Sequence, residues 1–282
     1  MAKRRRDRDR LTKEQHQPHW DHRRIWLRSS VGYLVLSIGL LIGLWKWLTW
    51  DNDRTPYWTA KIVARIPHDD QAFTQGLVFD RGELIEGTGK YGKSEVRRIE
   101  LPTGKILSQT ALTDDYFGEG LTVVGNLIVQ LTWKRGTAFL YDRDTLKLVK
   151  QTPYSGQGWG ITFDGEHLIT SDGTSALKYR KPTDFKIVRT VQVSDGNWPV
   201  SRLNELEFID GRIYANIWRK DRIAVIHSDT GQVEAWLDLK SLWPAHPTEA
   251  VLNGIAYDSK TKQLLVTGKH WPHLFQIEII RP

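Results

Sequence analysis

One sequence motif recurs five times along the chain, and this repetition constrains the fold more than any other feature. The copies begin at Gly76, Gly120, Gly160, Glu205 and Gly254, so they follow one another at intervals of 44, 40, 45 and 49 residues. A period of about 40 to 50 residues is typical of the blades of β-propellers. The chain is therefore expected to fold as an array of five similar units.

Each copy predicts a β-hairpin, because two alternating apolar runs flank a short polar turn. The first copy reads GLVFDRGELIEGTG from Gly76, with its turn at residues 80–82. A second hairpin follows in the first four copies, for example SEVRRIELPTGKILSQT from Ser94. No long helical period competes with this pattern. The sequence thus predicts an all-β fold, a five-bladed β-propeller with four strands in each blade.

The fifth unit ends early and needs a strand from elsewhere. It closes with LFQIEII from Leu274, and no fourth strand follows. The unassigned run AKIVARI from Ala60 can supply that strand. Pairing the first strand with the last would close the ring and leave no exposed edge.

The charge of the chain is concentrated near its N-terminus. The net charge is +7, and residues 1–28 hold ten Lys or Arg against four Asp or Glu, a net charge of +6. The rest carries only +1, which is a poor basis for following a phosphate backbone. We therefore expect no nucleic-acid partner.

Residues 29–50 are expected to form a single transmembrane helix. Val31 to Leu44 contain no charge, and a Trp-rich end extends the segment to about the 20 residues that cross a bilayer. Basic residues precede the segment, so the N-terminus is expected in the cytoplasm. The segment is long and no small-x-small cleavage site follows it, which favours a signal anchor over a cleaved signal peptide.

The predicted organisation follows from these segments. Residues 1–28 form a basic cytoplasmic tail, residues 29–50 the signal anchor, residues 51–59 a linker and residues 60–282 the propeller domain. That domain is expected to be membrane-anchored and periplasmic or extracellular. The chain contains no cysteine, which excludes disulfides, Cys nucleophiles and Cys-ligated zinc. His270 and His273 are too closely spaced for a helical ligand pair, and we expect neither metal nor cofactor.

Two sets of repeat-equivalent residues predict a site, because equivalent positions of a radial array emerge at the same end of its channel. The first set precedes each copy of the motif: Gln75, Glu119, Trp159, Asn204 and Asn253. The second set follows each first hairpin: Gly89, Trp133, Gly173 beside Asp172, Trp218 and Lys269. In an antiparallel hairpin the start of one strand lies beside the end of its partner, so both sets are expected on one face.

Together these sets suggest acid–base chemistry. A lone carboxylate such as Glu119 in a Trp-walled pocket should have a raised pKa, and the indoles can receive a cationic amine. Each residue also has a simpler interpretation: Glu119, Asn204 and Asn253 are common in turns, Lys269 could be a solvated cation, and the tryptophans could pack in the core. Their coincidence at equivalent positions favours a site.

Ten short motifs, in order, resemble those of the plant and bacterial glutaminyl cyclases. They begin at the following residues: FTQGL at Phe73, GTGKYGKS at Gly87, FGEGL at Phe117, LTWK at Leu131, GWG at Gly158, SDG at Ser171, LNELE at Leu203, ANIW at Ala215, LNGI at Leu252 and GKHWP at Gly268. The resemblance extends from about Ile62 to Ile279. Lys90 departs from it, standing where an apolar residue is expected.

The resemblance implies a five-bladed propeller that converts the N-terminal glutamine of a peptide or protein to pyroglutamate and releases ammonia without a metal. Glu119 is implied as the general acid and base. The resemblance also implies substrate-binding roles for six further residues: Gln75 and Asn204 for the amine and amide, Lys269 for the substrate backbone or an oxyanion, and Trp133, Trp159 and Trp218 as walls.

Two other functions remain open on the sequence. A calcium-dependent propeller lactonase would need several carboxylates that converge on the channel, and only Glu119, Glu205 and Asp172 are available. A non-catalytic propeller at the cell envelope could bind peptides with the same Trp-rich mouth.

Overall fold

The computed structural model describes residues 37–38 and 54–282. The predicted tail and nearly all of the predicted anchor lie outside these described residues. Within residues 37–38 and 54–282, no helix has the length and apolar character needed to cross a membrane. The chain divides between Arg54 and Thr55, and the second unit, Thr55–Pro282, is all-β.

Thr55–Pro282 contains 22 strands. Three separate four-stranded antiparallel sheets comprise β2 (Thr74–Asp80), β3 (Glu83–Thr88), β4 (Glu95–Glu100) and β5 (Ile106–Ala111); β6 (Gly118–Val124), β7 (Leu127–Thr132), β8 (Thr137–Asp142) and β9 (Leu148–Pro153); and β10 (Ile161–Phe163), β11 (Leu168–Thr170), β12 (Ala176–Arg180) and β13 (Ile187–Gln192).

The remaining strands form one small and one large sheet. The small sheet pairs β14 (Ser194–Asp195) with β15 (Trp198–Pro199). The eight-stranded sheet joins two further groups of four: β16 (Leu203–Ile209), β17 (Arg212–Ile217), β18 (Arg222–His227) and β19 (Val233–Asp238) with β20 (Leu252–Asp258), β21 (Gln263–Gly268), β22 (His273–Ile280) and β1 (Tyr57–Pro67).

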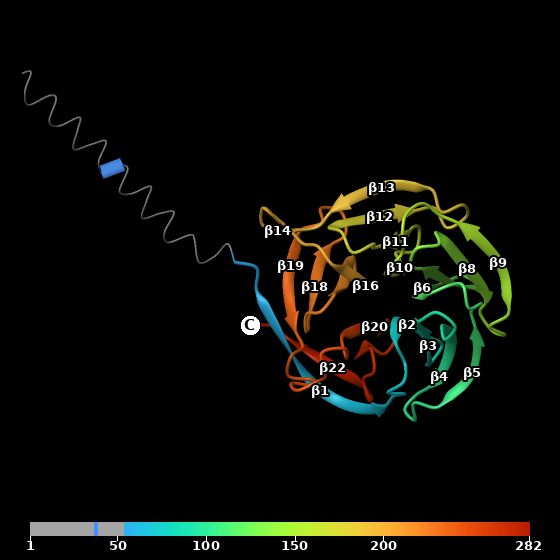
Figure 1. Ribbon diagram of the computed structural model, residues 1–282. Coiled ribbons are helices and arrows are strands. Elements are labelled where there is room, and N and C mark those ends of the chain that lie inside the picture. The colour runs from blue at the N-terminus through green and yellow to red at the C-terminus, as the bar shows by residue number, and fades with distance from the viewer. Residues whose placement is uncertain (1–36, 39–53) are drawn as a thin grey trace, which may run out of the picture. The chain divides into compact units, whose positions relative to one another are not determined.

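These groups are arranged in a ring, a propeller-like fold (Figure 1). The first strands of the groups, β2, β6, β10, β16 and β20, contact one another in a closed cycle. They approach closely because four of the five carry a glycine of the repeated motif at or near their start: Gly76, Gly120, Gly160 and Gly254. A Cβ on Gly120 would lie only 2.7 Å from the carbonyl oxygen of Trp159, and one on Gly160 would collide with the carbonyl oxygen of Asn204. The recurring glycine is therefore a packing requirement of the innermost strands.

The ring closes by pairing the N-terminal strand with the C-terminal one, as the sequence predicts. β1 runs antiparallel to β22, from Thr59 opposite Ile280 to Pro67 opposite His273. β1 begins at Tyr57 rather than at Ala60, so the predicted linker of residues 51–59 ends before Tyr57. The physical reason is a second pairing, because Tyr57 and its neighbour pair in parallel with Trp236 and Leu237 of β19.

The core lies between neighbouring sheets of the ring. Within Thr55–Pro282, five hydrophobic clusters each combine residues from two adjacent groups of strands. The cluster at the closure joins Ile66 of β1 and Leu274 of β22 to Leu77 and Leu84 of the first sheet. Burial of apolar surface at these interfaces, about 25 cal/mol for each Å², holds the sheets around a common axis.

We predict that the closing strand contributes strongly to stability. Ile66 is 6% exposed and Val63, on the same strand, is 45% exposed. Ile66→Ala should lower the free energy of unfolding by about 2–5 kcal/mol, since it removes buried methylene groups and leaves a cavity. Val63→Ala, the matched control, should change it by less than about 0.5 kcal/mol. Urea unfolding measures both, and equal effects would contradict the importance of the buried face.

Candidate active site

The two repeat-equivalent sets lie at the same end of the ring. Members of the first set stand within two residues of the start of each innermost strand, and members of the second set follow the end of its hairpin partner, directly in all units but the third, where Gly173 stands three residues after β11. Backbone hydrogen bonds close four of these hairpins in the same way: Gly89 N–H donates to Phe73 (2.8 Å), Trp133 to Phe117 (3.0 Å), Trp218 to Arg202 (2.9 Å) and Lys269 to Val251 (2.8 Å). We call this end the mouth.

Glu119 supplies a largely buried carboxyl group at the mouth. Its side chain is held between Gly118 and Gly120 at the start of β6, and the residue is only 5% exposed. The carboxyl group accepts no hydrogen bond from any residue that the structure describes. Burial raises the pKa of Glu119 well above its ordinary value, and the positive charge of Lys269 only partly opposes this shift. Its protonated form is therefore favoured over that of an exposed carboxyl group, which suits a group that must hold and return a proton.

Lys269 is the opposite charge in the same site. It follows β21, is 5% exposed, and its Nζ lies 4.4 Å from the centre of the Phe73 ring. Burial lowers the pKa of Lys269 to about 8, and the charge of Glu119 opposes that shift. The two groups influence each other without a direct ion pair within the described part of the chain. Both charges thus remain available to a bound molecule.

Two buried amides belong to the site. Gln75 is 3% exposed, and its Oε1 accepts a hydrogen bond of 3.3 Å from Asn253 Nδ2, which also donates to the carbonyl oxygen of Thr74 at 3.0 Å. This contact orients Gln75 so that its Nε2 is free to donate. Asn204 is 2% exposed, and its side chain has no partner among the described residues; its main-chain oxygen is bound by Ser171 Oγ at 2.6 Å.

The predicted tryptophans form partly buried aromatic walls. Trp159 and Trp218 meet edge to face with ring centres 5.7 Å apart. Trp133 meets Phe117 in the same manner, also at 5.7 Å. The indole of Trp159 covers Gly173, where an added Cβ would lie 2.8 Å from the ring. Glycine at that position therefore allows the wall to form.

Sequence reasoning gave no role to two residues that complete this arrangement. The rings of Phe73 and Phe117 meet edge to face at 6.1 Å and link Lys269 to Trp133. Both stand two residues before a member of the first set, so the motifs FTQG and FGEG carried the signal. Asn253 was recognised as a set member, but its contact with Gln75 depends on the tertiary structure.

The carboxylates that a calcium-dependent lactonase would use do not converge. Asp172 forms an ion pair of 2.6 Å with Lys178, which together with hydrogen bonds lowers its pKa despite partial burial. Glu205 is 1% exposed, and burial together with the neighbouring Glu207 raises its pKa well above the ordinary value. Among residues 37–38 and 54–282, no three His, Asp or Glu side chains are placed to hold a metal ion.

The comparisons with known proteins agree with this geometry. A family model described as glutamine cyclotransferase matches residues 36–279. The chain belongs to the glutamine cyclotransferase family. A glutaminyl-peptide cyclotransferase of Arabidopsis thaliana is 42% identical over 226 residues, which cover 78% of this chain and 71% of the plant protein. The crystal structure of Myxococcus xanthus glutaminyl cyclase is similar to this chain with a TM-score of 0.77 and 35% identity, and covers 81% of this chain and 100% of the other.

Membership of the cyclotransferase family confirms the resemblance inferred from the ten motifs. We predict that the stability of Glu119→Gln relative to the original protein rises with pH. As pH rises above about 4.3, the carboxyl group of the unfolded chain ionises before the folded one does, so the free energy of unfolding falls. Glutamine does not ionise and avoids this loss.

Urea unfolding at pH 5 and pH 8 measures the effect. The stability of the variant relative to the original protein should rise between pH 5 and pH 8 by about 1 kcal/mol or more. Other buried carboxyl groups, such as Glu205 and Glu207, are common to both proteins and cancel in the difference. A relative stability that stays constant or falls between these pH values would contradict a raised pKa for Glu119.

Proposed function

We propose that this protein converts the N-terminal glutamine of peptides and proteins to pyroglutamate and releases ammonia. The observation that carries the proposal is the pair formed by Glu119 and Lys269, two buried ionisable groups that influence each other's pKa in an aromatic-walled mouth. Membership of the glutamine cyclotransferase family supports it. The activity named for the plant relative, glutaminyl-peptide cyclotransferase, is the same reaction.

The first chemical step is an attack within the substrate. Glu119, in its ionised form, accepts a proton from the α-amine of the N-terminal glutamine. The amine nitrogen then forms a bond to the carbon of its own γ-carboxamide. Burial favours the uncharged form of Glu119, which makes its ionised form a stronger base than an exposed carboxylate.

The second step expels ammonia. Attack converts the carboxamide oxygen to an oxyanion, which the ammonium of Lys269 stabilises in a site with little water. Glu119 returns its proton to the carboxamide nitrogen, the carbon–nitrogen bond breaks and the five-membered lactam remains. One carboxyl group therefore serves as base and then as acid.

The amides and indoles position the substrate. Gln75, oriented by Asn253, presents its Nε2 to the substrate, and Asn204 offers an amide without another partner. Trp133, Trp159 and Trp218 bound the space in which the glutamine side chain folds towards its own amine. Holding the two reacting groups close together in this way supplies a large part of the rate enhancement of an intramolecular attack.

The number of blades in the ring and the location of the protein in the cell are also proposals. The closed cycle of innermost strands supports five blades, with β20, β21, β22 and β1 as the blade that joins both termini. The apolar run within residues 29–50, preceded by ten Lys or Arg, supports a signal anchor with the N-terminus in the cytoplasm and the propeller outside.

Replacing Glu119 tests the reaction. Glu119→Gln should reduce kcat for ammonia release from a Gln-initiated peptide by about 10²- to 10⁴-fold, because the proton shuttle is lost. Ammonia release and the corresponding loss of mass from the peptide are the two measurements. Glu166→Gln is the matched control, since that side chain is 84% exposed on the turn between β10 and β11, and it should leave kcat unchanged.

Failure of the folded original protein to release ammonia would contradict the enzymatic proposal. Retained peptide binding would then favour a peptide-binding module.

The pKa of Lys269 predicts the alkaline limit of activity. The ammonium form is needed for the oxyanion and is lost as pH rises through about 8, so kcat should fall on the alkaline side of that value. Lys269→Arg should move this limit to higher pH, because a guanidinium stays charged above pH 12. The pH profile of kcat tests this. The original protein and Lys269→Arg are compared on the same peptide, so the ionisation of the substrate amine contributes equally to both profiles. If the alkaline limit of kcat is the same in both proteins, the role of Lys269 is contradicted.

Cell fractionation tests the anchor. The full chain should remain with membranes after carbonate extraction, and a chain that begins at residue 51 should be released. External protease should reach the propeller, since a signal anchor of this polarity exports it. Full-length protein in the soluble fraction would contradict the proposed anchor.

A further inference from the structure

The mouth carries a third repeat-equivalent set, one position beyond the second set already described. In four of the five units the residue that follows the end of the first hairpin is basic. We call these four residues the rim set: Lys90 after Gly89, Lys134 after Trp133, Arg219 after Trp218 and His270 after Lys269. The third unit has Thr174 near this position, beside the paired Asp172.

Most of the rim set adopts a backbone conformation that favours glycine. The φ angles of Lys90, Arg219 and His270 are +94°, +61° and +60°. Side chains with a Cβ seldom occupy this left-handed region, where glycine has no steric penalty. The basic side chains are therefore present at positions where local conformation alone would select a different residue.

The three Lys and Arg members of the rim set lie against the aromatic residues of the mouth. Lys134 Nζ is 3.9 Å from the ring centre of Trp133, Arg219 Cζ is 4.7 Å from that of Trp218, and Lys90 Nζ is 4.8 Å from that of Phe73. None of the three forms an ion pair with a residue that the structure describes. Their charges are thus held at the mouth and are free to meet an anion.

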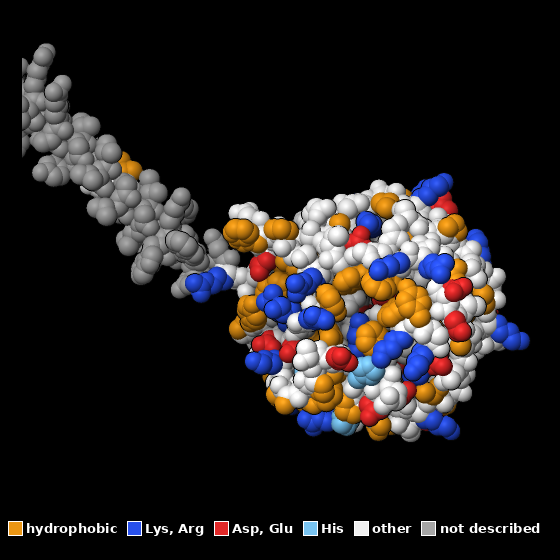
Figure 2. All heavy atoms as spheres, viewed as in Figure 1, with side chains coloured by type: hydrophobic (Ala, Val, Ile, Leu, Met, Phe, Trp, Pro, Cys, Tyr) orange, Lys and Arg blue, Asp and Glu red, His pale blue; other side chains and the backbone are white. Residues whose placement is uncertain are grey.

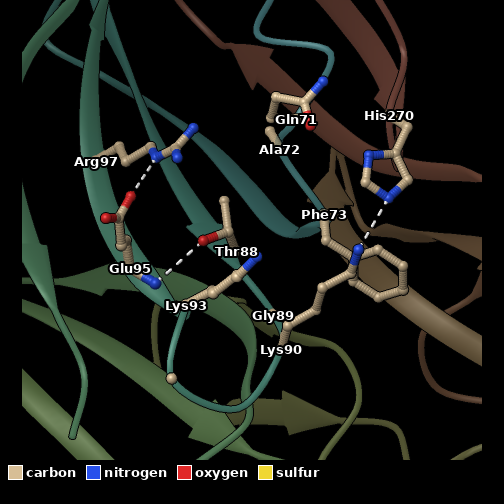
Figure 3. A pocket seen from close by; sticks show the side chains of 11 residues that line it. Gln71, Ala72, Phe73, Thr88, Gly89, Lys90, Lys93, Glu95, Arg97 and His270 are labelled. Carbon is tan, nitrogen blue, oxygen red and sulfur yellow. Dashed lines mark hydrogen bonds and ion pairs between the residues drawn. The ribbon is translucent and has the colours of Figure 1, made fainter. Parts of the chain in front are cut away.

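Lys90 has the most defined surroundings (Figure 3). Its Nζ lies 3.2 Å from His270 Nε2, and His270 Nδ1 lies 2.9 Å from the carbonyl oxygen of Asp70. An ammonium can only donate, so Nε2 accepts and Nδ1 donates. Both side chains line a hollow of about 330 Å³ beside Phe73. Nearby Arg97, by contrast, is neutralised by Asp69 and Glu95.

The hollow adjoins the proposed catalytic group. The Phe73 ring contacts Lys90 and also Lys269, whose Nζ is 4.4 Å from the ring centre. On the face shown in Figure 2, Lys and Arg side chains gather with hydrophobic ones around the middle of the ring. A carboxylate placed in this hollow would therefore stand one aromatic ring away from the site.

A peptide substrate must pass over the rim set. This step rests on the proposed function, in which the N-terminal glutamine fills the mouth. The rest of the chain then leaves across the rim, and at about 3.3 Å for each extended residue the next three span about 10 Å. We infer that the rim set selects peptides and proteins with Asp or Glu at positions 2 to 4, the three residues that follow the N-terminal glutamine.

Charge reversal in the full-length protein tests this selection. The double variant Lys90→Glu/Arg219→Glu is compared with Lys147→Glu. Lys147 is exposed and lies on the turn between β8 and β9, at the opposite end from the mouth because β8 starts at the mouth and runs away from it. The substrates are C-terminally amidated peptides that carry acidic, neutral or basic residues after glutamine.

The original protein should show a higher kcat/KM for the acidic peptide than for the basic one, by about two- to fivefold for each charged pair. The difference should reside in KM, because the rim binds substrate and transition state equally. Rising ionic strength should weaken it. The double variant should reverse the preference, and Lys147→Glu should behave as the original protein.

Equal kcat/KM for all three peptides, or an unchanged preference in the double variant, would overturn the inference and leave the proposed function intact. Absence of turnover with every peptide would instead defeat the proposed function. Fluorescence anisotropy of the same peptides on the original protein and on Glu119→Gln then decides the inference separately. Equal affinity for acidic and basic peptides there would overturn it.

Discussion

The pairing of β1 with β22 is the constraint on which the rest of the structure depends. It joins the two ends of the domain in one sheet and so places the last group of strands beside the first. The candidate site crosses that junction. Asn253 of the last group bonds Gln75 of the first, and Lys269 of the last group lies over Phe73 of the first. A ring that failed to close would separate these pairs even if every strand formed.

The closed ring also explains how the site can hold two buried ionisable groups. Glu119 and Lys269 are each 5% exposed and have no direct ionic partner in the described residues. Such burial is unfavourable by several kcal/mol for each ion. The apolar clusters between neighbouring sheets offset it, because they bury most of the aliphatic side chains of the domain. The same burial produces the raised and lowered pKa values on which the proposed acid–base chemistry relies.

The site could be located from the repeats because hairpin geometry is local. Alternation and turn residues indicate where each strand starts and ends, and equivalent positions of equivalent hairpins must face the same end. Glu119, Trp133, Trp159 and Lys269 were identified in this way. The start of β1 could not be placed as well, since Tyr57 is held by a pairing with β19, which lies almost 180 residues away in the chain.

The sequence by itself determined the number of repeat units, their strands and the residues that share one mouth, because periodicity and turn chemistry act over a few neighbouring residues. Only the tertiary structure decided which of those residues interact. The electrostatic coupling of Glu119 with Lys269, the orientation of Gln75 by Asn253 and the place of Phe73 between two lysines join different units of the ring. Those distances are set by packing between sheets, which no pattern within a single unit contains.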